Sequence, residues 1–215
     1  MSEIRVENII GETGVDAVNF TKGVNVTGIA TATNVSVGSS VTATNFFGSG
    51  AALTGISAGI THVDQFRLSS NVTNSGNNAT ITPWERVGTS IHAASAAPHG
   101  AGMSVSSGIF TFPVTGKYLV ILMMKASCGV DDNVQIYIKV TTNNSSYTTL
   151  TGATDGQNGG SGVRNASGTA IAFVDVTDTS QVKLLFHADS VGTNSFFQGG
   201  TSEGTDVVFV RVADT

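Results

Sequence analysis

Apolar and polar residues alternate with a period of two through the second part of the chain. The alternation is clearest at 133–142, where Val134, Ile136, Ile138 and Val140 share one side and polar residues share the other. This is the pattern of a strand with one face in water. Similar patterns predict further strands at 61–70, 107–114, 117–127, 168–176, 180–190 and 205–214. So many strands separated by turn residues predict an all-β, antiparallel sandwich, most simply a jelly roll.

The segment KYLVILMMKAS at 117–127 departs from this alternation because it is apolar on both sides. Such a run is typical of a central strand that is covered on both faces, or of one that faces a subunit interface. Both interpretations stay open at the level of sequence.

Residues 1–58 follow a different pattern of short apolar alternations cut by glycines. Gly28, Gly38 and Gly48 stand ten residues apart, and Thr-Ala-Thr-Asn occurs at Thr31 and again at Thr42. This predicts small β units, each one short strand and one turn. A region this short with few large side chains buries too little area to fold alone. We therefore expect an intertwined region that shares its core with other chains, the alternative being a disordered leader, and a separate head domain at 59–215.

Composition limits the kinds of partner. Only 12% of the residues are charged and the net charge is −5, so the chain lacks the basic surface that nucleic-acid binding requires. The single cysteine, Cys128, lies in an apolar segment and is predicted to be a buried core residue. Neither a signal peptide nor a membrane span is recognisable, so we expect synthesis in the cytoplasm and no membrane insertion.

The sequence contains no recognisable catalytic motif. The four histidines stand on separate segments, and Ser-x-x-Lys at 180–183 falls in a predicted strand without its companion motifs. A polysaccharide hydrolase would need paired carboxylates in a groove, and the acidic residues are too sparse to nominate a pair. The sequence therefore predicts a protein that is not an enzyme and has no organic cofactor.

Two polar segments are candidate binding sites. Asp131 and Asp132 stand in a predicted turn between two long strands, where carboxylate oxygens could hold calcium. The Gly/Asn-rich segment 154–165 is a predicted exposed loop, and such loops on rigid sandwiches often carry recognition. Its candidate contact residues are Asn158, Arg164 and Asn165.

The segment SGIFTFPVTGKYLVILMM at 107–124 resembles the signature of the globular heads of the complement first component and the tumour necrosis factor superfamily. The matching residues are Gly108, Phe110, Phe112, Pro113, Gly116 and Tyr118. The resemblance implies a jelly roll that forms a homotrimer through one apolar face. The candidates for that face, each of which could instead belong to the core of one chain, are Phe110, Tyr118, Tyr137, Phe186 and Phe209.

The N-terminal region resembles the leaders of virion structural proteins of tailed bacteriophages, particularly those of cyanobacteria. The similarity lies in the start at Met1 to Val6, the turn from Phe20 to Gly23 and the joint from Gly48 to Ile56. It implies a virion protein, a short trimeric fibre or spike that contacts other virion proteins of tail or capsid through Ile4, Val6 and Phe20. The head would then bind a host surface glycan or protein. The alternatives are a capsid decoration protein without receptor binding and a soluble lectin-like module.

Overall fold

The computed structural model describes residues 24–31, 37–38, 40–42, 44, 60–73, 79–88, 98–189, 191–192, 194–200 and 204–215. The chain divides into two units, Met1–Leu53 and Thr54–Thr215. The described residues of the first unit contain no strand, so the predicted intertwined region, which requires other chains, stays a prediction. The predicted attachment residues Ile4, Val6 and Phe20 lie outside the described residues.

Every regular element in the described part of the second unit is a β-strand. The strands are β1 (His62–Leu68), β2 (Val72–Thr73), β3 (Ala79–Thr80), β4 (Trp84–Arg86), β5 (Ser104–Ser106), β6 (Ile109–Thr111), β7 (Gly116–Cys128), β8 (Asp132–Thr141), β9 (Thr148–Gln157), β10 (Arg164–Val176), β11 (Lys183–Asp189), β12 (Phe196–Phe197) and β13 (Asp206–Ala213).

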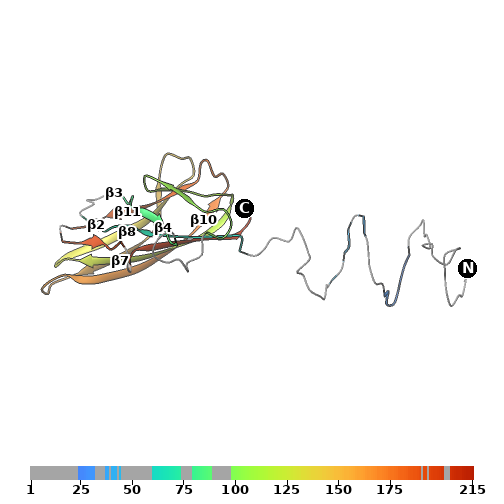
Figure 1. Ribbon diagram of the computed structural model, residues 1–215, viewed down its shortest axis with the longest axis horizontal. Coiled ribbons are helices and arrows are strands. Elements are labelled where there is room, and N and C mark those ends of the chain that lie inside the picture. Colours follow the sequence, from blue (N-terminus) through green and yellow to red (C-terminus); the bar gives the residue numbers. More distant parts are fainter. Residues whose placement is uncertain are drawn as a thin grey trace, which may run out of the picture. The chain divides into compact units, whose positions relative to one another are not determined.

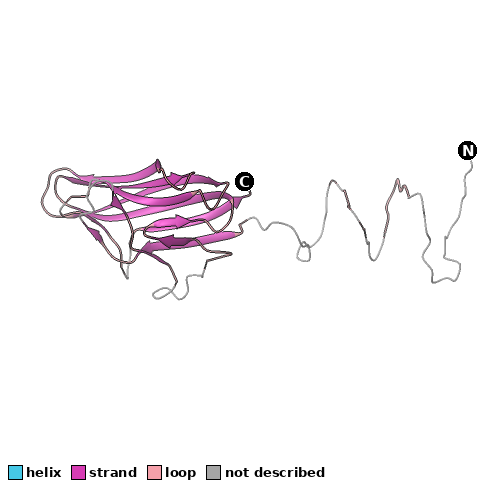
Figure 2. Ribbon diagram, turned by 90° about the horizontal axis from the view of Figure 1, so that it is seen from above, coloured by secondary structure: helices cyan, strands magenta, loops and turns pink. Residues whose placement is uncertain are grey.

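These strands form two sheets, and every pairing between them is antiparallel. Sheet A has seven strands in the order β2-β12-β7-β13-β1-β4, with β10 also paired to β7. Sheet B has six strands in the order β5-β6-β11-β8-β9, with β3 also paired to β11. The sheets pack as two layers (Figure 1 and Figure 2). The predicted all-β antiparallel sandwich is confirmed.

An aromatic cluster fills the space between the sheets. The Phe110 ring lies 5.1 Å from Phe66, 5.5 Å from Phe186 and 5.2 Å from Phe209, centroid to centroid. The Trp84 ring stands 4.9 Å from Phe186, and its Nε1 donates a hydrogen bond to the Ile81 carbonyl over 3.0 Å. Tilted and edge-on pairs at these separations are the favoured aromatic geometries. The cluster joins the two sheets into one core.

Four of the five aromatic residues that were candidates for the subunit interface lie instead in the core of one chain. Phe110, Tyr118, Phe186 and Phe209 are at most 1% exposed within one chain, so their side chains cannot reach a neighbour. The physical reason is strand parity, because each occupies the side of its strand that faces the other sheet. Tyr118 packs on Phe112 at 4.7 Å and donates its hydroxyl proton to the Val114 carbonyl.

The segment that resembles the complement and tumour necrosis factor heads forms a strand, a turn and a second strand. β6 ends at Thr111, before Pro113, and β7 begins at Gly116. Gly116 has a φ of 143°, and a Cβ there would overlap the Arg211 guanidinium. The turn therefore requires glycine at this position.

The predicted central strand is β7, which pairs with β10, β13 and β12. Along β7 the side chains of Tyr118, Val120, Leu122 and Met124 enter the core. The alternate residues Leu119, Ile121 and Met123 are also apolar, yet they lie on the outer face of sheet A and are only partly buried. The second apolar side of the segment thus faces away from the sandwich.

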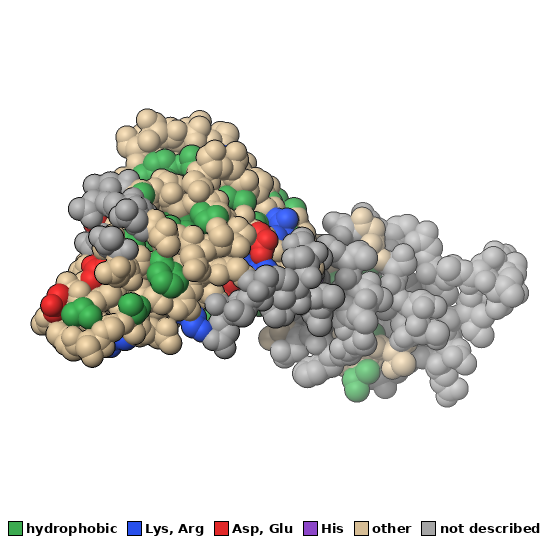
Figure 3. All heavy atoms as spheres, turned by 60° about the vertical axis from the view of Figure 1, so that its left-hand side comes forward, with side chains coloured by type: hydrophobic (Ala, Val, Ile, Leu, Met, Phe, Trp, Pro, Cys, Tyr) green, Lys and Arg blue, Asp and Glu red, His purple; other side chains and the backbone are tan. Residues whose placement is uncertain are grey.

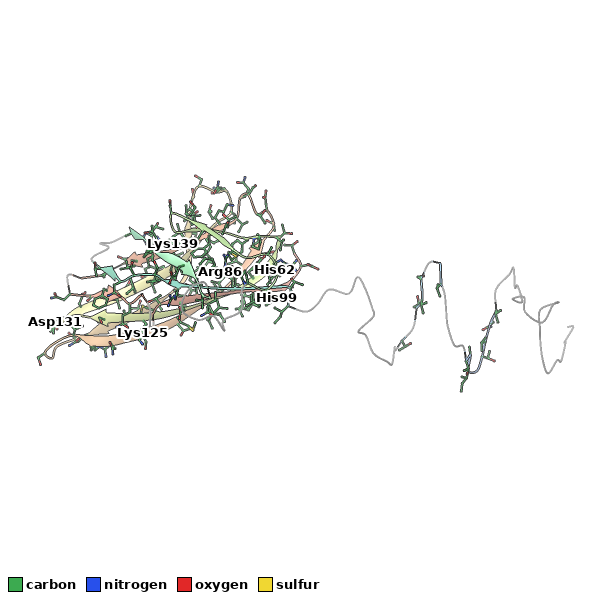
Figure 4. The ribbon with its side chains drawn as sticks, viewed as in Figure 1. His62, Arg86, His99, Lys125, Asp131 and Lys139 are labelled. Atoms are coloured by element: carbon green, nitrogen blue, oxygen red, sulfur yellow. The ribbon has the colours of Figure 1, made fainter. Side chains whose placement is uncertain are left out.

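The head has two distinct ends, here called base and tip. At the base β1 begins beside the end of β13, because His62 pairs with Arg211. At the tip β7 turns into β8 through Asp131. Figure 4 places His62 and His99 at one end and Asp131 at the other. The described head therefore begins and finishes at its base.

Candidate functional site

Two turns at the tip enclose an open hollow of about 410 Å³. One is the β7–β8 turn and the other follows β9. The lining residues are Asp131, Asp132, Asn133, Gly156, Gln157 and Asn158. Figure 3, which brings this end of the head forward, shows mainly uncharged polar side chains and backbone, with several apolar patches and a few acidic groups, whereas the residues that line the hollow are all polar or glycine. The hollow therefore offers hydrogen-bonding groups more than apolar area.

The two predicted calcium ligands line this hollow, and each carboxylate already accepts a hydrogen bond. Asp131, in the left-handed region at φ 54°, accepts from the Gly159 amide at 2.7 Å. Asp132 accepts from the Asn133 amide at 2.8 Å and from the Ser195 hydroxyl. Within the described residues no group of three or more His, Cys, Asp and Glu side chains could hold a metal. The calcium hypothesis stays a prediction that this donor set does not favour.

The segment between β9 and β10 is held in shape by the Gln157 side chain, together with the hydrogen bond from Gly159 to Asp131. The Gln157 amide donates to the carbonyls of Gly159 at 3.3 Å and Gly162 at 3.0 Å. Gly159, Gly160 and Gly162 all have positive φ, which favours glycine at these turn positions. Asn158 is exposed at the rim of the hollow, so of the three predicted recognition residues it alone belongs to the turn.

The predicted loop at 154–165 is shorter than expected, because both of its ends are strands. Arg164 and Asn165 are the first residues of β10. Arg164 forms an ion pair with Asp155 at 2.6 Å, and Asn165 accepts a hydrogen bond from the Gln198 amide at 3.3 Å. Arg164 therefore holds the β9–β10 hairpin together instead of being presented to a ligand.

Asp155 stabilises the same hairpin. Its carboxylate accepts hydrogen bonds from the Gly156 amide at 2.8 Å and the Ser167 amide at 3.1 Å. Partial burial acts to raise the pKa of Asp155, but these amides together with Arg164 outweigh burial and lower it. The charged carboxylate is thus the form that the folded hairpin favours.

The outer side of sheet A carries an exposed apolar surface, which we call the apolar face. Phe173 is 71% exposed and Ile171 is 55% exposed. Strand register aligns Phe173 with Leu119 and Val210, and aligns Ile171 with Ile121 and Val208. The apolar face consists of Leu119, Ile121, Met123, Ile171, Phe173, Val208 and Val210. Contiguous apolar surface of this kind marks an interaction site.

Charged residues border the apolar face at both ends. Toward the base, Lys117 forms an ion pair with Asp175 at 3.8 Å across β7 and β10. Toward the tip, Lys125 of β7 stands opposite Ser167 of β10. An apolar centre with a polar rim is the usual anatomy of a protein interface.

The sequence analysis missed Phe173 and Ile171. In the middle of β10 the inward positions are the small residues Ala170 and Ala172, whereas the large residues Ile171 and Phe173 point outward. At 170–173 large and small residues therefore alternate in the sense opposite to that of an ordinary half-buried strand, and the usual pattern returns at Val174 and Val176. The sequence contained a usable indication of this surface. A strand with alanine on its inward side packs closely against the core, and its large apolar side chains are then left on the outer side, where another chain can cover them.

The three histidines that the structure describes lie in two places, His62 and His99 at the base and His187 on β11. His62 and His99 stand at the base, where burial, Arg211 and His99 lower the pKa of His62 in that order. His187 is 8% exposed on β11, between β8 and β3. The described residues include no helix that could cross a lipid bilayer.

Known structures resemble the head, although no protein-family model and no curated protein matches the sequence. Eiger TNF from S. frugiperda has 17% identity and a TM-score of 0.55, covering 71% of this chain and 93% of that one. Murine APRIL at pH 8.0 has 14% identity and a TM-score of 0.48, covering 70% and 98%. The globular domain of zebrafish complement 1qA has 12% identity and a TM-score of 0.41, covering 69% and 93%. The Eiger likeness shows that the head has the jelly-roll fold of a TNF domain.

Proposed function

We propose that this chain is a non-enzymatic structural protein of a tailed-phage virion, a short homotrimeric fibre or spike. Residues 1–58 attach to other virion proteins, and the jelly-roll head projects from the particle. The observation that supports this proposal most directly is the apolar face, which a single chain leaves exposed around Phe173 and Ile171.

The apolar face supports assembly because its exposure has no role within one head. The aromatic cluster already forms a closed core, so these outward side chains stabilise the fold little. Covering them with a second copy removes apolar area from water, which is favourable. Each chain that contributes the same face around a threefold axis meets the next chain, and the ring closes. The resemblance of residues 107–124 to heads that trimerise supports three copies.

The separation of base and tip supports a projecting head. The described part of the head begins and finishes at its base, next to His62, whereas Asp131 and Asn158 stand at the tip. The chain enters the described head at its base, at the opposite end from the tip. The polar hollow there is then the surface that meets a host glycan or protein. The phage role itself is inferred from the leader sequence.

Sedimentation equilibrium of the full chain tests the assembly. We expect the mass of three chains, and we expect residues 59–215 alone to give three chains as well, because the apolar face lies in the head. A monomeric full chain would overturn the proposed trimer and the shared core of the leader.

Labelling of phage particles tests the location. Antibody against the head should decorate wild-type particles, and deletion of residues 1–58 should abolish attachment of an otherwise folded head. Retained attachment would contradict the anchoring role. Particles that lack the head but adsorb normally would identify a capsid decoration protein instead of a receptor-binding fibre, and glycan binding by the free protein in the absence of attachment would identify a lectin-like module.

A further inference from the structure

The outer side of sheet B carries the one predicted interface residue that the core does not contain. Tyr137 is half-buried on β8, and its side chain points away from the aromatic cluster. Figure 4 shows Lys139, two residues along the same strand, on the opposite side of the sandwich from Lys125 of sheet A. Tyr137 therefore does not belong to the apolar face, and its place at a subunit interface stays a prediction.

The ring of Tyr137 lies across the neighbouring strand. Tyr137 pairs in register with Gly152 of β9, and a Cβ at position 152 would overlap the ring, coming within 2.9 Å of Cε1 as well. The hydroxyl donates a hydrogen bond to the Gln135 side-chain oxygen at 2.5 Å. Glycine below and Gln135 at the hydroxyl end thus fix the ring against the sheet.

On the outer side of sheet B, hydrogen-bonding side chains lie in the rows on either side of this ring, and its partner in register on β11 is the buried His187. In the row toward the tip, register aligns Gln135 with Asp189 of β11 and with the exposed Thr154 of β9. In the row toward the base, Lys139 stands opposite Thr149 of β9 and the buried Leu185 of β11. We call the surface formed by Gln135, Tyr137, Lys139, Gly152, Thr154 and Asp189 the flank platform.

We propose that the flank platform binds a pyranose ring of a neutral glycan. The C–H groups on one side of a pyranose pack on an aromatic ring, while its hydroxyl groups point outward in the plane, where the amide, hydroxyl and charged groups of this surface lie. An aromatic ring with polar neighbours provides both kinds of contact. Besides the buried His187, which pairs with Tyr137 in register, one acidic and one basic residue flank the ring, so the platform favours a neutral sugar over an anionic one.

The size of the platform also favours a sugar over a protein. A stable protein interface needs on the order of 800 Å² on each partner, with several anchoring side chains. The flank platform has a single aromatic ring within a polar surround. An aromatic side chain covering a strand glycine also stabilises sheets, which explains why the ring lies on Gly152. Stabilisation of the sheet by Tyr137 does not require hydrogen-bonding groups around the aromatic ring. The two interpretations, sheet stabilisation alone and sugar binding, therefore predict different results when sugars are added.

Sugar binding at a single flank platform does not require the proposed trimer, but the overall affinity for a surface that carries many glycans does depend on it. Three copies on one particle-bound head would add avidity to a weak single-site interaction. This consequence depends on the proposed function, whereas binding at one platform does not.

Saturation-transfer NMR on the full chain tests the proposal with triacetylchitotriose, maltotriose and lactose as probes. Each is used at about 10 mM, well above the roughly millimolar dissociation constant of a weak single site. We expect transfer to at least one probe in the wild-type protein and in Tyr137→Phe, which keeps the ring. We expect Tyr137→Ala to weaken binding at least about tenfold, since the stacking contact is lost. Tyr147→Ala, a matched change of a half-buried tyrosine away from the platform, should bind like the wild type.

A second variant covers the case in which Tyr137→Ala does not fold. Gly152→Ala keeps the ring but displaces it, because the added methyl group would occupy its position. Weaker binding in Gly152→Ala supports the platform. Absence of transfer to all three probes, or unchanged binding in Tyr137→Ala and Gly152→Ala, overturns it. Sedimentation of the same variants separates the two proposals, since loss of sugar binding with the trimer mass retained concerns the platform alone.

Discussion

Replacing Phe173 by serine removes the most exposed aromatic residue of the apolar face. The ring is 71% exposed in one chain, so the substitution should alter the folding of the head little. On the outer surface of β10 serine leaves no internal cavity. A change in assembly can therefore be read separately from a change in fold.

The magnitude follows from the area that Phe173 exposes. A phenylalanine side chain presents about 200 Å², so 71% exposure leaves about 140 Å² to be covered by a neighbouring copy. At about 25 cal/mol per Å² this burial contributes about 3.5 kcal/mol for each copy. Each 1.4 kcal/mol is tenfold in an equilibrium constant, so one copy corresponds to about 300-fold in association.

Sedimentation equilibrium over a range of micromolar concentrations measures this effect. We expect Phe173→Ser to sediment as a monomer where the wild type is a trimer, with an unchanged far-ultraviolet circular dichroism spectrum. The control is Leu150→Ser, which removes a 43% exposed leucine from the edge strand β9 and should remain trimeric. If Phe173→Ser keeps the trimer mass at every concentration, the apolar face is not the subunit interface.

Three further predictions concern the charged groups of the head. Asp64→Asn should lower the free energy of unfolding by about 3 kcal/mol in urea denaturation, because it breaks a pair in which the 5% exposed Asp64 holds Arg86 at 3.0 Å. The lowered pKa of Asp155 contributes stability above its unfolded value of 3.8, and this is lost as pH falls through the folded pKa. Hydrogen exchange of the β9–β10 hairpin should therefore accelerate on acidification below pH 3.8, and Asp155→Asn should remove that pH dependence. Millimolar calcium should shift the melting temperature by less than about 1 °C, because Asp131 and Asp132 already accept protein hydrogen bonds.

Each of these predictions has an outcome that contradicts it. Equal stability of Asp64→Asn and the wild type would mean that Arg86 finds another partner. Acceleration of exchange in Asp155→Asn at the same pH as in the wild type would assign the pH dependence to another group. A clear rise in melting temperature with calcium, reversed by a chelator and absent in Asp131→Asn, would restore the calcium hypothesis.

The fold was predictable because the core strands obey simple rules. Val134, Ile136 and Ile138 alternate with polar residues and are all buried, as the period of two requires. Cys128 is fully buried, as its apolar segment predicts. Gly116 stands at the turn into β7, where its positive φ excludes other residues. These features depend on local chemistry that one chain expresses by itself.

Strand β9 could not be predicted from its residues. The segment TTLTGATDGQ has no regular apolar alternation, and its Ala153 is its single fully buried hydrophobic residue. β9 is an edge strand of sheet B, so pairing with β8 determines its conformation more than its own side chains do. The predicted recognition loop was consequently too long, and Arg164 was assigned to the wrong element.

The candidate sites were harder to predict than the fold. The alternation of side chains along a strand shows which residues share a side, but it does not show which side faces the core. Tyr118 and Phe209 were candidates for the interface and lie in the core, while Phe173 was no candidate and lies on the apolar face. Which side of a strand faces the core depends on how the strands pair into sheets and on which face of each sheet packs against the other. Neither residue type nor spacing contains that information.

The common location of the start of β1 and the end of β13 determines how the head carries mechanical load. A pull applied at His62 along β1 acts on a strand that is paired with β13 from His62 to Arg67. Hydrogen bonds between antiparallel strands run perpendicular to the strands. If the base is anchored and the tip binds a surface, as proposed, tension between them loads these bonds in shear, all at once, and does not peel them apart one by one.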